Sequence, residues 1–171
     1  SSFAMFAVGR AFEQVRNSVA YPNLNVKIAA THAGITVGED GATHQAIEDI
    51  ALMRAVPNMR IICPCDQYET AWAIEEAINT NGPVYIRLGR SDVPDIYSES
   101  TKFEFGKGVE LVQGTDITVI ATGLMVSKAI QASNELKNKG ISARVIDIHT
   151  IKPIDKEIII KAAKETRGIL V

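Results

Sequence analysis

The chain has 171 residues, of which 46% are hydrophobic and 22% are charged, and its formal net charge is −2. This composition can bury one or two globular cores, and it lacks the basic runs with which proteins bind nucleic acids or anionic membranes. No apolar stretch approaches the ~18 residues of a membrane span, and the start has no signal-peptide pattern. We therefore expect a cytoplasmic protein that binds neither nucleic acid nor a membrane.

Helices and strands alternate through the first half of the chain. Apolar spacing predicts a helix at 3–19, with no strand before it. Asp66, with Glu69 three residues later, resembles a capping box at the start of a helix at 67–79. The remaining predicted elements are strands at 25–31, 59–63 and 84–88 and a helix at 43–55. This order predicts an α/β fold in which helices flank a parallel sheet.

The segment 94–104 is polar, contains proline and shows no periodicity, so we interpret it as a linker between a domain at 1–93 and another at 105–171. The second domain is also predicted to be α/β, with helices at 126–138 and 155–164 and strands at 105–112, 117–121, 143–148 and 168–171. The chain starts without a strand and ends on an apolar one. We therefore expect the first domain to be incomplete at its N-terminus and the second at its C-terminus.

The loop at 30–45 concentrates the polar chemistry of the chain. It carries His32, Asp40 and His44 among three glycines and three threonines, and it follows a strand, where ligands bind in open α/β sheets. Thr43 is predicted to cap the helix at 43–55, which would place His44 in the first helical turn, where anionic ligands are favoured. The alternative is that the histidines only brace a glycine-rich turn. Several polar groups in one loop favour a functional site.

The two cysteines, Cys63 and Cys65, flank Pro64 at the end of a predicted strand. A C-x-C pair can begin a metal site, but it does not complete a tetrahedral ligand set. We therefore expect small buried thiols in a reduced cytosol and no metal site.

Several segments together resemble transketolase, a thiamine-diphosphate enzyme, over the whole chain. They are GEDGATHQ (38–45), preceded by ATHAGITV (30–37) and followed by IEDIALMRAVPNMRIICPCD (47–66), together with SFAMF (2–6), PVYIRLGR (83–90) and TIKPID (150–155). The resemblance implies the pyrimidine-binding domain of that family, followed by the beginning of its C-terminal domain.

Phe3 and Phe6 match family residues beside the aminopyrimidine ring of the cofactor, and Phe6 matches the direct stacking contact. Two aromatic side chains three residues apart can present one apolar face to a flat ring. Without the resemblance, such a pair is more often ordinary core packing.

His32, Asp40 and His44 match sugar-contacting residues of the family, and Arg90 matches its phosphate-binding arginine. Imidazoles exchange protons near neutral pH, which gives His32 and His44 a catalytic role as well. A guanidinium suits a terminal phosphate. Arg87 is left open as a surface residue or an ion-pair partner.

The implied reaction of the pentose phosphate pathway transfers a two-carbon ketol unit between sugar phosphates, with thiamine diphosphate supplying the carbanion chemistry. In the family, a glutamate that lies before the equivalent of Ser1 activates the cofactor. A Gly-Asp-Gly motif on another domain binds the diphosphate and Mg²⁺, and this chain has no such motif. We therefore expect a homo- or hetero-oligomer, such as a dimer, that is completed by a diphosphate-binding domain or subunit and is inactive as this chain alone. The alternatives are a deoxyxylulose-phosphate synthase-like enzyme and a non-catalytic assembly subunit.

Overall fold

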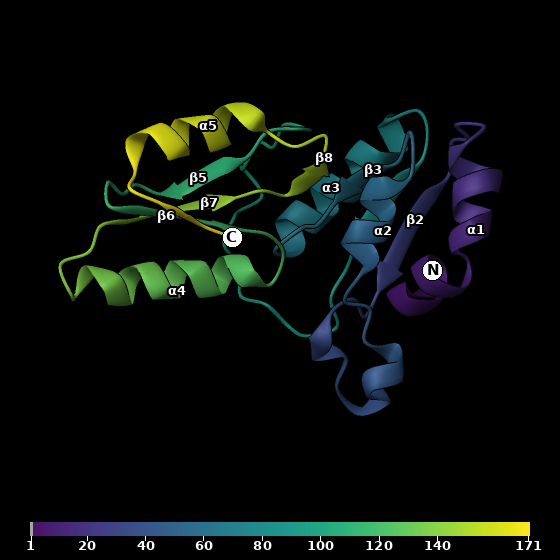
Figure 1. Cartoon of the computed structure of the whole chain (residues 1–171), viewed down its shortest axis with the longest axis horizontal. Coiled ribbons are helices and arrows are strands. Elements are labelled where there is room, and N and C mark those ends of the chain that lie inside the picture. The colour runs from purple at the N-terminus through teal and green to yellow at the C-terminus, as the bar shows by residue number, and fades with distance from the viewer. Residues whose placement is uncertain (1) are drawn as a thin grey trace. The chain divides into compact units, whose positions relative to one another are not determined.

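The computed structural model describes residues 2–171 and divides them into two compact units (Figure 1). Unit 1 contains the chain up to Pro64 together with Thr70–Asp92, and unit 2 contains Cys65–Glu69 together with Val93–Val171. Both units combine strands with helices, so the predicted α/β class is confirmed. In the described part of the chain, no helix is both long and apolar enough to cross a bilayer.

Unit 1 is built on a parallel sheet, as the alternating elements predict. Its strands lie in the order β1-β2-β4-β3 and span Ser2–Phe3 (β1), Lys27–Thr31 (β2), Val84–Arg87 (β4) and Arg60–Ile62 (β3). The central strand β4 buries Val84, Tyr85 and Ile86 in succession, which is typical of a parallel strand covered on both faces.

The expectation that no strand precedes the first helix is wrong. Ser2 and Phe3 form β1, which pairs with the end of β2 and sets Phe3 opposite Thr31. Two residues are too few for a periodic pattern, so sequence spacing gave no sign of this strand. Its pairing sets the side chain of Phe3 beside His32 of the polar loop.

Helices pack around this sheet, and the first is wider than a regular α-helix. It contains α1 (Phe12–Gln14) between turns at Met5–Arg10 and Val15–Ala20, where Ala11 N–H donates to the carbonyl of Phe6, five residues earlier. The predicted helix at 67–79 is confirmed as α3 (Gln67–Asn79). At its start, the Asp66 carboxylate accepts a hydrogen bond from the Glu69 N–H at 2.8 Å.

The predicted helix at 43–55 is wrong in its first half. Residues Ala42–His44 form a short 3₁₀ turn, and α2 begins only at Asp49 and ends at Ala55. The cause is a backbone bridge between Ala33 and Ala46, in which Gly34 N–H donates to the Ala46 carbonyl at 2.8 Å and holds this part of the chain extended. Thr43 therefore caps no helix, and His44 does not lie in the first turn of α2.

Unit 2 contains a four-stranded sheet in the order β5-β7-β6-β9. Its strands are Val109–Val112 (β5), Ala143–Asp147 (β7), Ile117–Ala121 (β6) and Ile169–Leu170 (β9); β5 is antiparallel, and the other pairings are parallel. The helices α4 (Met125–Lys137) and α5 (Lys156–Glu165) cover opposite faces of this sheet (Figure 1). The sequence analysis missed β8 (Thr150–Lys152), whose three residues also form no recognisable pattern.

Neighbouring strand residues supply the two cores of unit 2. Ala121 and Val145 pack with Val126 and Ala129 of α4, whereas Ile120 and Ile146 pack with Ala162 of α5. This alternation is what a sheet covered on both faces requires. Asp155 begins α5, because its carboxylate accepts hydrogen bonds from the N–H groups of Glu157 and Ile158.

Candidate functional site

Four aromatic rings from separate segments of unit 1 gather at the end of its sheet. Phe3 stacks on His32, with ring centroids 3.9 Å apart and ring planes at 15°. Phe6 lies nearly parallel to Phe3 at 6.0 Å, and His44 meets Phe6 edge-on at 5.2 Å. The structure therefore brings both predicted aromatic residues and both predicted histidines into one group.

Backbone geometry explains how these rings meet. The register of β1 with β2 places Phe3 next to Thr31, the residue before His32. His32 has φ 61°, a left-handed conformation that is uncommon outside glycine. Such conformations persist where surrounding contacts hold them and cluster at functional sites. Here, stacking on Phe3 accompanies the unusual turn out of β2.

Each site histidine contacts the threonine hydroxyl that precedes it. The Nδ1 atom of His32 lies 2.9 Å from Oγ1 of Thr31, and Nδ1 of His44 lies 2.9 Å from Oγ1 of Thr43. These contacts orient both imidazoles through their Nδ1 atoms. In each ring, Nε2 is then the nitrogen that can form a hydrogen bond with a ligand. The sequence signal was present as two Ala-Thr-His triplets, 30–32 and 42–44, but their shared geometry was not predicted.

Asp40 and Arg90 form a second, more open set beside the same loop. Arg90 Nη1 lies 3.8 Å from Asp40 Oδ2, and about two fifths of each side chain is exposed (39% and 36%). The same Nη1 donates a hydrogen bond to the carbonyl of Val37. Arg90 thus supports the turn that carries Asp40, and the separation within the ion pair leaves both groups able to meet a polar ligand.

A buried polar network that the sequence analysis missed lies behind this loop. Asp49, the first residue of α2, is 1% exposed, and its Oδ2 accepts hydrogen bonds from Tyr85 Oη and from Arg87 Nε, both at 2.8 Å. Burial, and then the charge of Asp49, raises the pKa of Tyr85, which keeps the hydroxyl protonated as a donor. Arg87 is therefore an ion-pair partner, the second of its two predicted alternatives.

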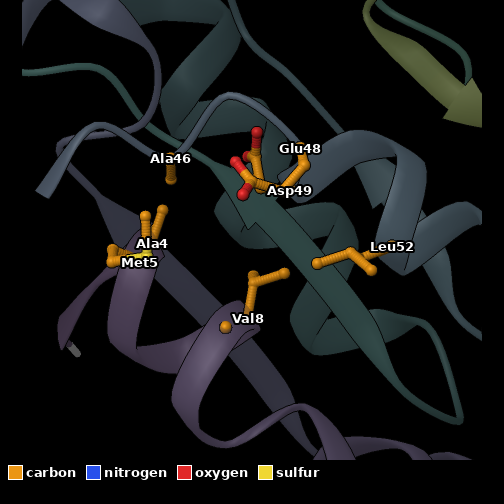
Figure 2. Close-up of a pocket in the computed structure, with 8 residues that line it drawn as sticks. Ala4, Met5, Val8, Ala46, Glu48, Asp49 and Leu52 are labelled. Carbon is orange, nitrogen blue, oxygen red and sulfur yellow. The ribbon is translucent and has the colours of Figure 1, made fainter. Parts of the chain in front are cut away.

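A small pocket lies between this network and the first helical segment (Figure 2). Its lining residues are Ala4, Met5, Val8, Gly9, Ala46, Glu48, Asp49 and Leu52. The volume, about 30 Å³, is far below the roughly 150 Å³ of an engineered cavity that binds benzene. It is too small for a sugar or a heteroaromatic ring, so the aromatic and polar sets on the loop remain the candidate site.

Unit 2 holds a second polar cluster, which is fully buried. Asp147 Oδ2 accepts a hydrogen bond from Tyr97 Oη at 2.8 Å and lies 3.6 Å from the Cys65 sulfur. Glu69 Oε2 accepts from the Cys65 N–H at 2.7 Å. The ligand-type atoms of Cys65, Glu69 and Asp147 lie within 4.8 Å of one another. Such a group could either bind a metal ion or retain a proton on its carboxyl groups.

Proton sharing accounts for the close approach of the two carboxyl groups. Burial, followed by the charge of Asp147, raises the pKa of Glu69 to about 9. Burial also raises the pKa of Asp147 to about 6, against the opposing effect of its hydrogen bonds from Tyr97 and Glu69. Both shifts have the same direction, so burial favours keeping a proton on this pair of carboxyl groups. Both cysteines are buried and outside any disulfide in the described chain, which confirms the expected buried thiols.

Comparison with known proteins matches both parts of the chain to one family. Residues 1–95 match the model of the transketolase pyrimidine binding domain, and residues 106–171 match that of the transketolase C-terminal domain. Fold and sequence together define an α/β chain in which a transketolase-type pyrimidine-binding domain precedes a transketolase-type C-terminal domain. More particularly, the chain belongs to the transketolase family, as the sequence resemblance predicted.

Individual relatives agree with this assignment. A putative transketolase C-terminal section from Methanocaldococcus jannaschii is 58% identical to this chain. The match covers 95% of this chain and 52% of the relative. One subunit of an apulose-4-phosphate transketolase from Phocaeicola vulgatus is 46% identical, with coverage of 98% and 54%. A split-gene transketolase, solved as an inactive beta4 tetramer, matches with a TM-score of 0.92 and 50% identity, over 98% of this chain and 54% of that one. The chain thus spans about half the length of these relatives.

Proposed function

We propose that this chain supplies the pyrimidine-facing and sugar-facing parts of a transketolase that transfers a two-carbon ketol unit between sugar phosphates. Residues 1–93 would form the pyrimidine-binding domain, 94–104 its linker, and 105–171 the start of the C-terminal domain. The observation that carries the proposal is the meeting of Phe3, Phe6, His32 and His44 in one ring cluster, at the loop that also carries Asp40.

The ring cluster fits the flat, apolar half of thiamine diphosphate. Phe3 and Phe6 are half-buried and nearly parallel, and together they form an aromatic wall of the kind that binds a heteroaromatic ring. His32 already covers Phe3 at 3.9 Å, so Phe6 is the better candidate for direct stacking. When bound, the cofactor supplies the carbanion chemistry of the transfer.

The polar groups fit a phosphorylated sugar. His32 and His44, held by their Nδ1 atoms, present Nε2 to hydroxyl or carbonyl oxygens and can move a proton there. Asp40 accepts a hydrogen bond from one hydroxyl, which discriminates between sugars that differ at that carbon. Arg90 binds the terminal phosphate through its guanidinium, at a position where it already supports the turn at Val37.

A diphosphate-binding partner would complete the site. The 171 residues contain no Gly-Asp-Gly motif, so Mg²⁺ and the diphosphate would be held by another domain or subunit, and this chain alone would be inactive. The side chains of Ile35, within the site loop, and of Ile47, two residues after it, are 71% and 69% exposed and would provide apolar surface for such a partner. The relative from Phocaeicola vulgatus is itself described as a subunit.

Mixing the full-length protein that contains this chain with its diphosphate-binding partner tests the proposal. We expect thiamine-dependent transfer between xylulose and ribose phosphates in the mixture and in neither component alone. Transfer without the partner would disprove the shared site. No transfer by the mixture would favour a non-catalytic assembly subunit, and condensation of pyruvate with glyceraldehyde phosphate would instead favour the deoxyxylulose-phosphate synthase-like alternative.

A further inference from the structure

The buried Asp49 network connects the site loop to the sheet behind it. Asp49 begins α2, directly after the loop, whereas Tyr85 and Arg87 lie on the central strand β4. Both donors converge on one carboxylate oxygen at 2.8 Å. An isolated buried carboxylate is costly, but a charge-assisted hydrogen bond from a guanidinium offsets much of that cost. The network therefore ties the end of the loop to a rigid strand.

The same arginine also lies against the beginning of the loop. Gly34 has φ 88°, and a Cβ atom added there would lie 3.3 Å from Arg87 Nη2. The adjacent Ala33 N–H donates to the carbonyl of Leu88, the residue after Arg87, at 3.1 Å. The guanidinium of Arg87 thus lies between Gly34, near the start of the loop, and Asp49, which begins α2 shortly after the loop ends.

Arg90 repeats this arrangement in the middle of the loop. It donates to the carbonyl of Val37, and a Cβ atom added at Gly38 would lie 2.9 Å from its Nη1. Two arginines three residues apart therefore support successive parts of the loop. They differ in exposure: the side chain of Arg90 is 39% exposed and suits a ligand, whereas that of Arg87 is 20% exposed and is held by Asp49.

We propose that Asp49 and Arg87 act as a positioning pair that holds the loop with His32, Asp40 and His44 in its binding geometry. The catalytic part of this inference rests on the proposed function. The pair would not touch the sugar itself. It would act by keeping both ends of the loop fixed, so that the two imidazoles and the carboxylate need no further ordering when the sugar phosphate binds.

The test compares Arg87→Met, Asp49→Asn and the double variant in the assembled enzyme, with Arg144→Met as a matched control. Arg144 is likewise an arginine in an ion pair, 2.7 Å from Glu165, but it lies in unit 2. In the Arg87 and Asp49 variants, we expect hydrogen exchange at 34–46 to accelerate about tenfold. We expect kcat/KM to fall about fivefold or more. The double variant should be no worse than the more damaging single variant, since the two residues act through each other.

A purely structural pair would behave differently. It would lower the melting temperature and accelerate exchange throughout unit 1, as Arg144→Met should do in unit 2 without changing exchange at 34–46. That pattern, or unchanged exchange in the loop, would overturn the positioning role. Exchange is measured independently of turnover. If the wild-type assembly shows no ketol transfer, the proposed function fails, while faster exchange confined to 34–46 still supports the positioning pair.

Discussion

The two polar clusters of this chain differ most in their access to solvent. The loop cluster of unit 1 leaves about two fifths of Asp40 and Arg90 exposed, whereas Cys65, Glu69 and Asp147 of unit 2 are at most 2% exposed. The contacts between polar groups are also looser in the loop cluster than in the buried cluster. The ion pair of the loop is long, at 3.8 Å, whereas burial raises the pKa of both carboxyl groups of the second cluster. Polar groups left open to solvent can exchange water for a ligand, whereas those of the buried cluster bind one another.

Removing Asp40 is expected to have the largest effect on activity and little effect on folding. In the assembled enzyme, Asp40→Ala should lower kcat/KM for ketol transfer at least about tenfold, or about 1.4 kcal/mol of transition-state stabilisation. His32→Ala should do the same, because it also removes a sugar contact. Steady-state kinetics with pentose phosphates measure the loss, and denaturant unfolding checks that stability is retained.

Glu39→Ala is the matched control, since Glu39 is the exposed acidic neighbour of Asp40 in the same turn. It should keep nearly all of the activity. Equal losses in the Glu39 and Asp40 variants would show that the turn is sensitive to any substitution, and unchanged turnover in Asp40→Ala would remove Asp40 from the site.

The buried cluster is expected to show its role through the pH dependence of stability. The pKa of Glu69 is raised from about 4.5 to about 9 in the folded chain. Between these values, the unfolded state releases a proton that the folded state keeps, so the free energy of unfolding falls as pH rises. Glu69→Gln preserves the size of the side chain and cannot ionise. We expect it to gain at least about 1 kcal/mol relative to wild type between pH 5 and pH 8, since one proton contributes up to about 1.4 kcal/mol per pH unit.

Urea unfolding at several pH values measures this difference, with Glu157→Gln as the control. Glu157 pairs with Lys107 at the surface, and its replacement should leave the slope with pH unchanged. Parallel pH profiles for wild type and Glu69→Gln would mean that Glu69 is ionised in the folded chain. A cation would then become the better explanation of the cluster.

Sequence patterns predicted the regular parts of this fold because those parts are repetitive. Helix 67–79 and strand 117–121 were predicted with the bounds that α3 and β6 have, since apolar periodicity runs through each of them. The start of α2 was misplaced for the opposite reason. A single long-range bridge, Ala33 to Ala46, keeps the residues before Asp49 extended, and no local pattern reports such a contact.

The site shows the same division between local and long-range information. Loop composition and the family resemblance identified His32, Asp40 and His44 as candidates, because these residues lie close together in one loop of the sequence. Asp49 was missed because an aspartate in a helix usually faces solvent, and only the fold brings Tyr85 and Arg87 to it. Buried networks between distant residues are therefore what sequence reasoning misses first.

Alanine substitutions at two glycines of the site loop distinguish the effect of backbone strain from that of displacing the Arg90 side chain. The expected difference in KM between the two variants is small. Gly38 and Gly41 have φ of 80° and 72°, so alanine is strained at both positions, at a cost of about 1–3 kcal/mol. Only at Gly38 would the new Cβ atom lie 2.9 Å from Arg90 Nη1; at Gly41 nothing lies within 4 Å. Gly38→Ala should therefore also displace the Arg90 guanidinium.

We expect KM for a sugar phosphate to be about threefold to fivefold higher in Gly38→Ala than in Gly41→Ala, a difference below about 1 kcal/mol. Measuring each variant with a phosphorylated acceptor and with its unphosphorylated analogue isolates the contribution of the phosphate. The excess effect of Gly38→Ala should vanish with the unphosphorylated sugar, since Arg90 then has no anion to bind. An equal excess with both acceptors would assign Arg90 to loop support alone, and the phosphate contact would have to come from another residue.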